Sequence, residues 1–211
     1  MEIVRPEKLF EIALLVFQKI SSVYGNSFNF PKQELAKIDY NLIARYLAYE
    51  IDEEDDSGNI TKKLIKRINF FSEEFPFKLK KLEKIISSKK IFAFGYDIYN
   101  RVTFYIKPYL NGLFSLEKLD YIIYMFFIIE HLLPTLKEKF NFSDQINIVL
   151  DFDNNDADTE LIRFIMYYIN CYYPLILGKL HIIKFQFESL KRNLSFKNEL
   201  GDLDFFRVSI E

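Results

Sequence analysis

Apolar residues recur with a helical period through the first third of the chain. They form one broad face in residues 7–24, and Gly25 ends the helix that this face predicts. A second helix is predicted over residues 38–51. In residues 60–75 the apolar side chains share one face with basic residues around it, which predicts an amphipathic helix with Asn59 as its N-cap.

The hydrophobic period changes near residue 90. Short runs rich in Phe, Ile and Val predict strands, with a hairpin between the first two, over residues 90–94, 101–106, 145–152, 179–185 and 205–210. A long helix is expected over residues 116–139, capped by Ser115. Another, capped by Asp156 or Asp158, separates the third and fourth strands. A strand, helix and strand in this order predict a parallel pair.

The charge and composition exclude two classes of protein. The 211 residues carry 28 Lys and Arg against 30 Asp and Glu, and half of them are hydrophobic. A disordered tail and a polybasic nucleic-acid arm are therefore excluded, and one or two domains are expected. The change of period predicts a helical N-terminal module over residues 1–86 and a second domain over residues 87–211.

The chain is expected to be cytoplasmic, with transient contact to membranes. Its start does not resemble a signal peptide, and the single Cys171 cannot form an internal disulfide. Polar residues such as Glu130 and Arg163 interrupt the longest apolar runs, so these runs are read as buried helices. The lysines between residues 78 and 90 form either a solvated helix face or a contact with anionic lipid.

Candidate catalytic and metal-binding residues are few. The Asp151-Phe-Asp153 pattern is similar to the DxD of haloacid-dehalogenase-type phosphatases, but the Gly and Thr that normally follow are missing. As a calcium loop it fails, because Asp156 stands where a glycine is required. A strand-end turn with helix capping is the preferred interpretation. His131 and His181 lack ligand-spaced partners, so we expect no metal, no cofactor and no catalytic residue.

Several spaced signatures together resemble the CRAL-TRIO family, which includes phosphatidylinositol and phosphatidylcholine transfer proteins. In chain order they are Leu42 to Ala48, Gly95-Tyr96-Asp97, Asn100-Arg101-Val102, Glu130, Ile148 to Asp151, Tyr172-Tyr173-Pro174 and Gly178 to Ile183. The resemblance implies an α/β fold, a CRAL-TRIO-like mixed β-sheet flanked by helices and preceded by a small helical module. It also implies an apolar pocket that encloses a lipid.

Candidate residues for the pocket wall and gate follow from this resemblance. They are Tyr121, Tyr124, Arg163, Phe164, Tyr167, Phe187, Phe196 and Lys197. The same side chains could instead fill a closed core. Phe164 stands where phosphatidylinositol-binding relatives carry an acidic residue, while Phe196-Lys197 matches the lysine that works with it. Half of that headgroup site is therefore missing.

The expected function is non-enzymatic binding and transfer of a phospholipid or another hydrophobic ligand. The alternative is a degenerate module without lipid, which serves as a protein-interaction subunit of a larger assembly. The departures from the headgroup pattern, and the end of the chain at Glu211 where relatives continue, motivate this alternative. A phosphatase that uses Asp151 and Asp153 is a remote third hypothesis. No nucleic-acid partner is indicated.

Overall fold

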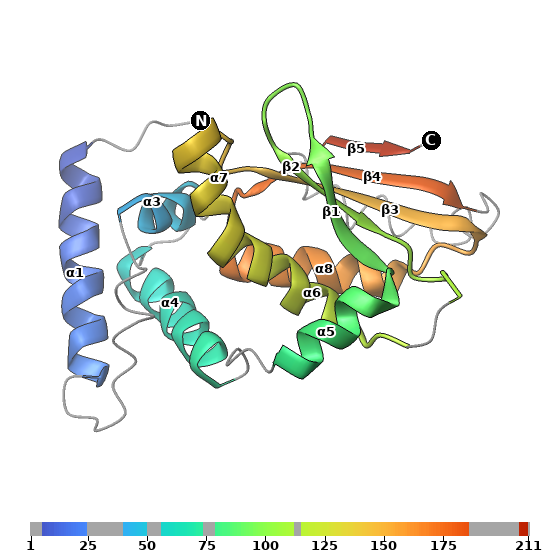
Figure 1. Cartoon of the computed structure of the whole chain (residues 1–211). Helices are drawn as coiled ribbons and strands as arrows, with labels where there is room; N and C mark the ends of the chain where they lie inside the picture. Colours follow the sequence, from blue (N-terminus) through green and yellow to red (C-terminus); the bar gives the residue numbers. More distant parts are fainter. Residues whose placement is uncertain are drawn as a thin grey trace. The chain divides into compact units, whose positions relative to one another are not determined.

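The computed structural model describes six stretches of the chain, and its elements follow the predicted order (Figure 1). The stretches are residues 6–24, 40–49, 56–73, 79–111, 115–185 and 207–210. The elements are α1 (Pro6–Tyr24), α3 (Tyr40–Tyr49), α4 (Asp56–Glu73), α5 (Leu79–Ser88), β1 (Ile91–Tyr96), β2 (Val102–Ile106), α6 (Lys118–Phe127), the π-helix η1 (Ile128–Leu132), α7 (Leu133–Phe140), β3 (Ile146–Asn155), α8 (Thr159–Tyr172), β4 (Leu177–Phe185) and β5 (Arg207–Ile210).

The chain divides into two compact units. The first contains residues 1–76 together with residues 169–175, which include the last turn of α8. The second contains residues 77–168 and 176–211. The boundary drawn from the sequence at residue 86 stays a prediction.

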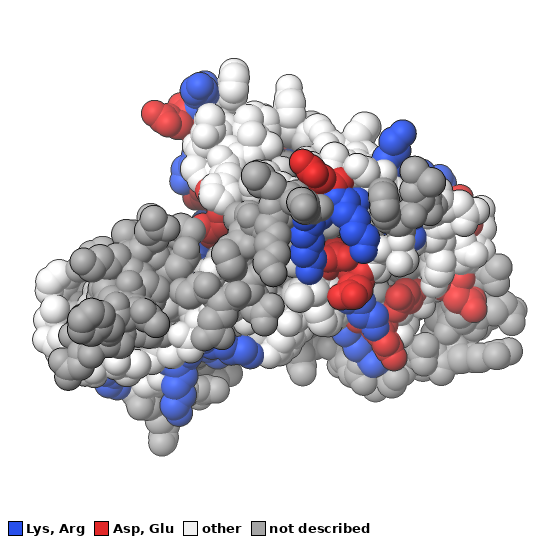
Figure 2. Space-filling model, turned by 60° about the horizontal axis from the view of Figure 1, so that its bottom comes forward, with Lys and Arg blue, Asp and Glu red and all other residues white. Residues whose placement is uncertain are grey.

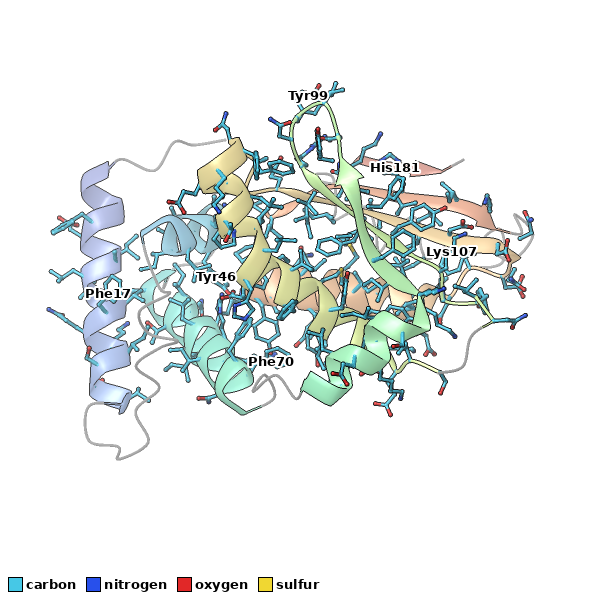
Figure 3. All side chains as sticks on the ribbon, in the orientation of Figure 1. Phe17, Tyr46, Phe70, Tyr99, Lys107 and His181 are labelled. Carbon is cyan, nitrogen blue, oxygen red and sulfur yellow. The ribbon has the colours of Figure 1, made fainter. Side chains whose placement is uncertain are left out.

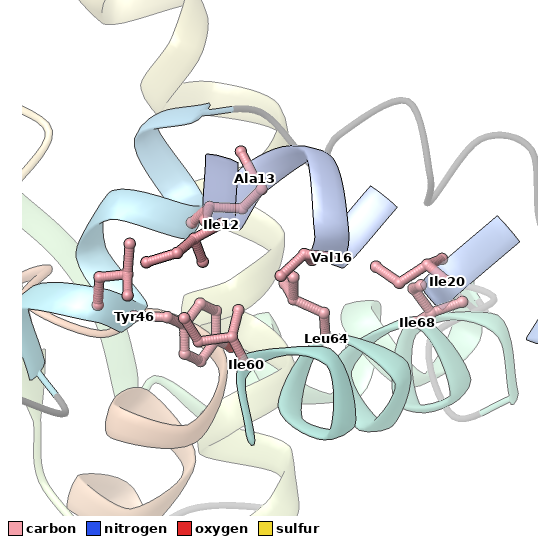
Figure 4. Packing of buried hydrophobic residues seen from close by; sticks show 10 residues of the cluster. Ile12, Ala13, Val16, Ile20, Tyr46, Ile60, Leu64 and Ile68 are labelled. Carbon is pink, nitrogen blue, oxygen red and sulfur yellow. The ribbon is translucent and has the colours of Figure 1, made fainter. Parts of the chain in front are cut away.

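The first unit has an apolar core between α1, α3 and α4 (Figure 4). Val16 and Ile20 on α1 and Leu64 and Ile68 on α4 are at most 1% exposed, and in each pair the two residues are one helical turn apart. Asn59 is not the N-cap that the sequence predicted, because α4 already begins at Asp56. Asn59 therefore lies inside the helix, just before the buried Ile60.

The second unit is built on a five-stranded mixed sheet in the order β1-β2-β3-β4-β5. β1 and β2 form the predicted antiparallel hairpin, and β2, β3, β4 and β5 run parallel. The predicted crossover between β3 and β4 is α8. Gly95, with φ +57°, lies at an irregularity in the β1–β2 register between Ala93 and Tyr96. A glycine suits this β-bulge because it adopts positive φ without strain.

A continuous helical segment, Lys118–Phe140, comprises α6, η1 and α7. Its cap is Glu117 rather than the predicted Ser115, because the Asp120 carboxylate accepts the Glu117 backbone N–H at 3.0 Å. By length and composition this segment could cross a membrane, but more than half of its most apolar stretch is buried in the fold. Asp120 pairs with Lys81 of α5 at 3.1 Å.

The prediction that Asp156 or Asp158 caps α8 is confirmed. Of the two candidates, Asp158 accepts the backbone N–H of Leu161 at 2.8 Å. Lys80, Lys81 and Lys84 of the lysine-rich stretch belong to α5, in which Leu82 and Ile85 are buried. On the face drawn in Figure 2, basic and acidic side chains lie next to one another.

Candidate functional site

The two faces of the sheet differ in chemistry. In β2, Val102, Phe104 and Ile106 are at most 3% exposed, whereas Thr103 and Tyr105 between them are only half-buried. Strand side chains alternate between faces, so the strand register extends this division across the sheet. The first face carries α6, whose Tyr124 ring meets Phe104 edge-on at 6.5 Å (Figure 1).

The second face is rich in aromatic and aliphatic groups. Its side chains come from β1 to β4: Phe92, Phe94, Thr103, Tyr105, Asn147, Val149, Asp151, Lys179, His181 and Ile183. The rings of Phe92 and Tyr105 stack at 5.5 Å, and Phe94 lies edge-on to each of them. Val149 of β3 pairs with His181 of β4 beside them. These middle-strand positions keep partial exposure, so the second face offers apolar contact surface.

A buried carboxylate lies on this face where the regular pairing of β3 with β4 is interrupted, between Asp151 and Asn155. Asp151 has no exposed surface and accepts a hydrogen bond from the Tyr105 hydroxyl at 2.6 Å. The Lys184 and Lys107 ammonium groups lie 3.3 and 3.6 Å from the same carboxylate. The backbone of Lys184 has φ 50°, so the extended conformation of β4 is broken at this residue. Its ammonium group contacts Asp151.

The hydrogen bonds decide the protonation state of this group. Burial alone would raise the pKa of Asp151, but the bonds from Tyr105, the Asp153 backbone and Lys184 outweigh it and hold the pKa below its usual value. Burial, together with the bond to Asp151, raises the pKa of Tyr105 to about 12. Asp151 is thus an ionised carboxylate held by donors on several sides. The sequence predicted only a strand-end turn at Asp151. That prediction accounts for the hydrogen bond that Asp151 accepts from the Asp153 N–H at 3.0 Å, but not for its other contacts.

Five of the eight predicted pocket residues lie on two described helices, α6 and α8. Tyr121, buried, and Tyr124, half-buried, are on α6, and the Tyr124 hydroxyl accepts the Ala93 backbone N–H at 3.4 Å. On α8, Phe164 packs against Tyr168 with ring centroids 4.6 Å apart.

Two further predicted residues on α8 are exposed, namely Arg163 and, at 51%, Tyr167. Phe187, Phe196 and Lys197 lie outside the described residues. The assignment of all eight residues to a ligand site therefore stays a prediction.

Sequence reasoning missed the second face. Phe92, Tyr105 and Val149 on this face were not proposed, nor were Lys107 and Lys184, which pair with Asp151 at its end. The signal was present in the period-2 spacing of Phe92 and Phe94 and of residues 103, 105 and 107, which places each set on one face of a strand. Lys184 carries no such signal, because its position depends on a local break in the strand.

Three of the sequence signatures meet in a polar cluster between β2, β3 and β4. Asp97 accepts bonds from Arg101 Nε at 2.7 Å and from Asn147 Nδ2 at 2.9 Å. A side chain at Gly178 would place its Cβ only 2.7 Å from Arg101 Nη1. Burial would raise the pKa of Asp97, but the bonds from Arg101 and Asn147 hold it well below its ordinary range. These residues therefore have a structural role: their contacts connect the β1–β2 hairpin to β3 and β4.

Two other signatures meet inside the first unit. The Tyr46 hydroxyl donates a hydrogen bond to the carbonyl oxygen of Cys171 at 2.6 Å. The Arg67 guanidinium lies between the rings of Phe71 and Tyr173, at 4.3 and 4.9 Å from their centroids. The residues around Tyr46 and the Tyr-Tyr-Pro segment are thus packed together as structural elements.

Comparison with known proteins gives the same family as the spaced signatures. Residues 86–187 match the family model of the CRAL/TRIO domain. Among solved structures, the chain is similar to the protein titled "Crystal structure of Sfh5", with a TM-score of 0.57 and 14% identity over 100% of this chain and 82% of that chain. No curated protein matches the sequence. The predicted fold class and the family resemblance are confirmed.

Proposed function

We propose that this chain, whose residues 86–187 match the CRAL/TRIO domain, binds a phospholipid or another hydrophobic ligand and exchanges it with membranes without catalysing a reaction. The domain belongs to a lipid-binding and transfer family. The observation that carries the proposal is the second face of the sheet, where stacked aromatic rings and aliphatic side chains remain partly exposed.

The chemistry of this face suits an acyl chain. Phe92, Tyr105 and Val149 offer a continuous apolar strip across three strands. Each methylene group that leaves water for such a surface contributes about 0.8 kcal/mol, so an acyl chain is retained without any reactive group. The carboxylate of Asp151 is fully buried and engaged by Tyr105, so its geometry favours a structural role over that of a nucleophile.

Native mass spectrometry of the purified protein, followed by organic extraction, tests whether a ligand is bound. The expected result is a stoichiometric lipid or other apolar molecule. Folded protein that carries no ligand and that also takes up no lipid from a cell extract would contradict the proposal. That outcome would favour the protein-interaction module instead.

A tryptophan scan tests where the ligand lies. The chain has no tryptophan, so a single introduced indole is a clean reporter. Val149→Trp places the indole on the second face, and we expect a phosphatidylcholine with a doxyl-labelled acyl chain to quench it. Ile86→Trp, on the exposed side of α5, is the matched control and should stay unquenched when the ligand is bound. Equal quenching of both indoles would argue against the second face.

A further inference from the structure

Exposed apolar side chains gather at one end of the second unit, at the tip of the β1–β2 hairpin. Tyr96, Ile98 and Tyr99 are 64%, 89% and 66% exposed, and Phe140 at the end of α7 is 63% exposed. The Phe142 ring lies 5.0 Å from that of Tyr96. These five residues are called the hairpin-tip patch. A cluster of large exposed apolar groups on one surface marks a contact site more often than an accident of packing.

The hairpin is held firmly in its protruding conformation. The Asp97 carboxylate accepts the backbone N–H groups of Tyr99 and Arg101 at 2.9 and 3.0 Å. The carbonyl oxygen of Asn100 accepts the Ser143 N–H at 2.9 Å, which ties the tip to the segment that follows α7. Figure 3 shows Tyr99 at the apex of the hairpin. Because the tip is already ordered, contact with a partner needs little further loss of conformational entropy.

The charges around the patch suit an anionic surface. Two nearby carboxylates are neutralised, since Asp97 pairs with Arg101 at 2.6 Å and Asp144 pairs with Lys137 at 2.7 Å. Lys139, next to Phe140, is exposed. By the helical period, Glu138 points away from the side that carries Phe140. Lys139 therefore adds one positive charge beside the apolar tip.

The geometry favours a membrane over a protein as the occupant. β1 is an edge strand of the sheet, but the bulge at Gly95 interrupts its ladder just before the tip. Such a bulge opposes the addition of another strand. Ile98 and Tyr99 lie on the turn of the hairpin. Tyr96 and Tyr99 combine an apolar ring with a polar hydroxyl, which is the chemistry enriched at the membrane–water interface.

We infer that the hairpin-tip patch docks the CRAL/TRIO domain on membranes that contain anionic lipid, with Ile98 and Tyr99 entering the headgroup region. This surface is distinct from the second face that we propose for the ligand. The inference does not require a bound ligand.

The test uses the full chain and vesicles of phosphatidylcholine with and without phosphatidylserine. Tyr99→Trp puts the only indole of the protein at the tip, and Ile86→Trp puts it at an exposed apolar site elsewhere in the same unit. With vesicles that contain phosphatidylserine, the emission of Tyr99→Trp should shift to the blue and be quenched by brominated acyl chains. That of Ile86→Trp should not change. Vesicle binding that leaves the Tyr99→Trp emission unchanged would overturn the inference.

Sedimentation with the same vesicles measures the contribution of the tip. The Ile98→Ser/Tyr99→Ser protein should bind at least about tenfold more weakly than the parent, because two apolar side chains no longer leave water. Ile86→Ser should bind like the parent. These side chains are exposed, so the variants should melt like the parent protein.

Two results separate this inference from the proposed function. Protein that carries a lipid in native mass spectrometry but gives equal sedimentation for parent and tip variant overturns only the docking surface. Empty protein whose tip binds vesicles overturns only the lipid-carrier function. A blue shift of Tyr99→Trp that depends on protein concentration and needs no vesicles would show contact between copies of the chain, and would also overturn membrane docking.

Discussion

Asp97→Asn tests whether charge holds the hairpin and the start of the parallel sheet together. The Asp97 carboxylate accepts bonds from Arg101 Nε and Nη2, from Asn147 Nδ2 and from two backbone N–H groups. Asparagine keeps the shape of the side chain but loses the charge. Its amide nitrogen is a hydrogen-bond donor, and it would face Arg101, Asn147 or a backbone N–H, which are donors as well.

The expected cost follows from the partial burial of the pair. The Asp97 and Arg101 side chains are only 24% and 16% exposed, so water screens their attraction weakly. A hydrogen bond to a charged group contributes about 1.5–3 kcal/mol, and the backbone bonds survive in part. We therefore expect Asp97→Asn to lower the free energy of unfolding by about 2 kcal/mol at neutral pH.

The pH dependence gives the sharper test. The pKa of Asp97 is lower in the folded protein than its unfolded value of about 3.9. The stabilisation is therefore complete above that unfolded value and is lost as the pH falls through the lower folded pKa. The difference between parent and variant should be constant above about pH 5 and should shrink below about pH 3.

Urea unfolding followed by circular dichroism measures both effects. The control is Asp144→Asn, which breaks an ion pair whose two side chains are 45% and 53% exposed. It should cost less than about 0.5 kcal/mol. The reasoning is refuted if Asp97→Asn costs no more than the control, or if its cost is the same at low pH.

Three further substitutions test the sheet and the core. Gly178→Ala should destabilise by about 1–3 kcal/mol in thermal melting, because its Cβ would lie 2.7 Å from Arg101 Nη1. Tyr105→Phe should raise the pKa of Asp151 in an NMR titration and cost about 1 kcal/mol, because a buried carboxylate loses a donor at 2.6 Å. Leu64→Ala, at a fully buried position, should cost about 2–5 kcal/mol in urea unfolding.

Each of these changes has a matched control. Gly95→Ala meets no atom within 4 Å and should show only the cost of its positive φ, about 1–2 kcal/mol. Tyr109→Phe removes a hydroxyl bonded to the Asp156 carbonyl and should leave the Asp151 titration unchanged. Leu14→Ala, at a position that is 48% exposed, should stay within about 0.5 kcal/mol of the parent. Equal effects in a variant and its control would contradict the corresponding explanation.

Local periodicity predicted most of the elements, because a helix or strand that buries one face has its apolar residues at a regular spacing. The hairpin, the parallel pair around α8 and the last strand all appear in the structure. The helix starts were less predictable. Ser115 and Asn59 are both good capping residues, yet Asp120 bonds the Glu117 N–H instead and α4 begins before Asn59. Capping depends on which of several polar side chains reaches the backbone, and composition alone does not decide that.

The order of the signatures predicted the family whose model matches residues 86–187, but only the tertiary structure decided which contacts their residues make. Asn147 and Gly178 are far from Asp97 and Arg101 in the chain, and they meet the hairpin because strand register brings β2, β3 and β4 side by side. Register also decides which side chains share the second face, since a shift of one residue would exchange the two faces. Phe92, Tyr105 and Asp151 therefore became neighbours through long-range pairing that no local pattern contains.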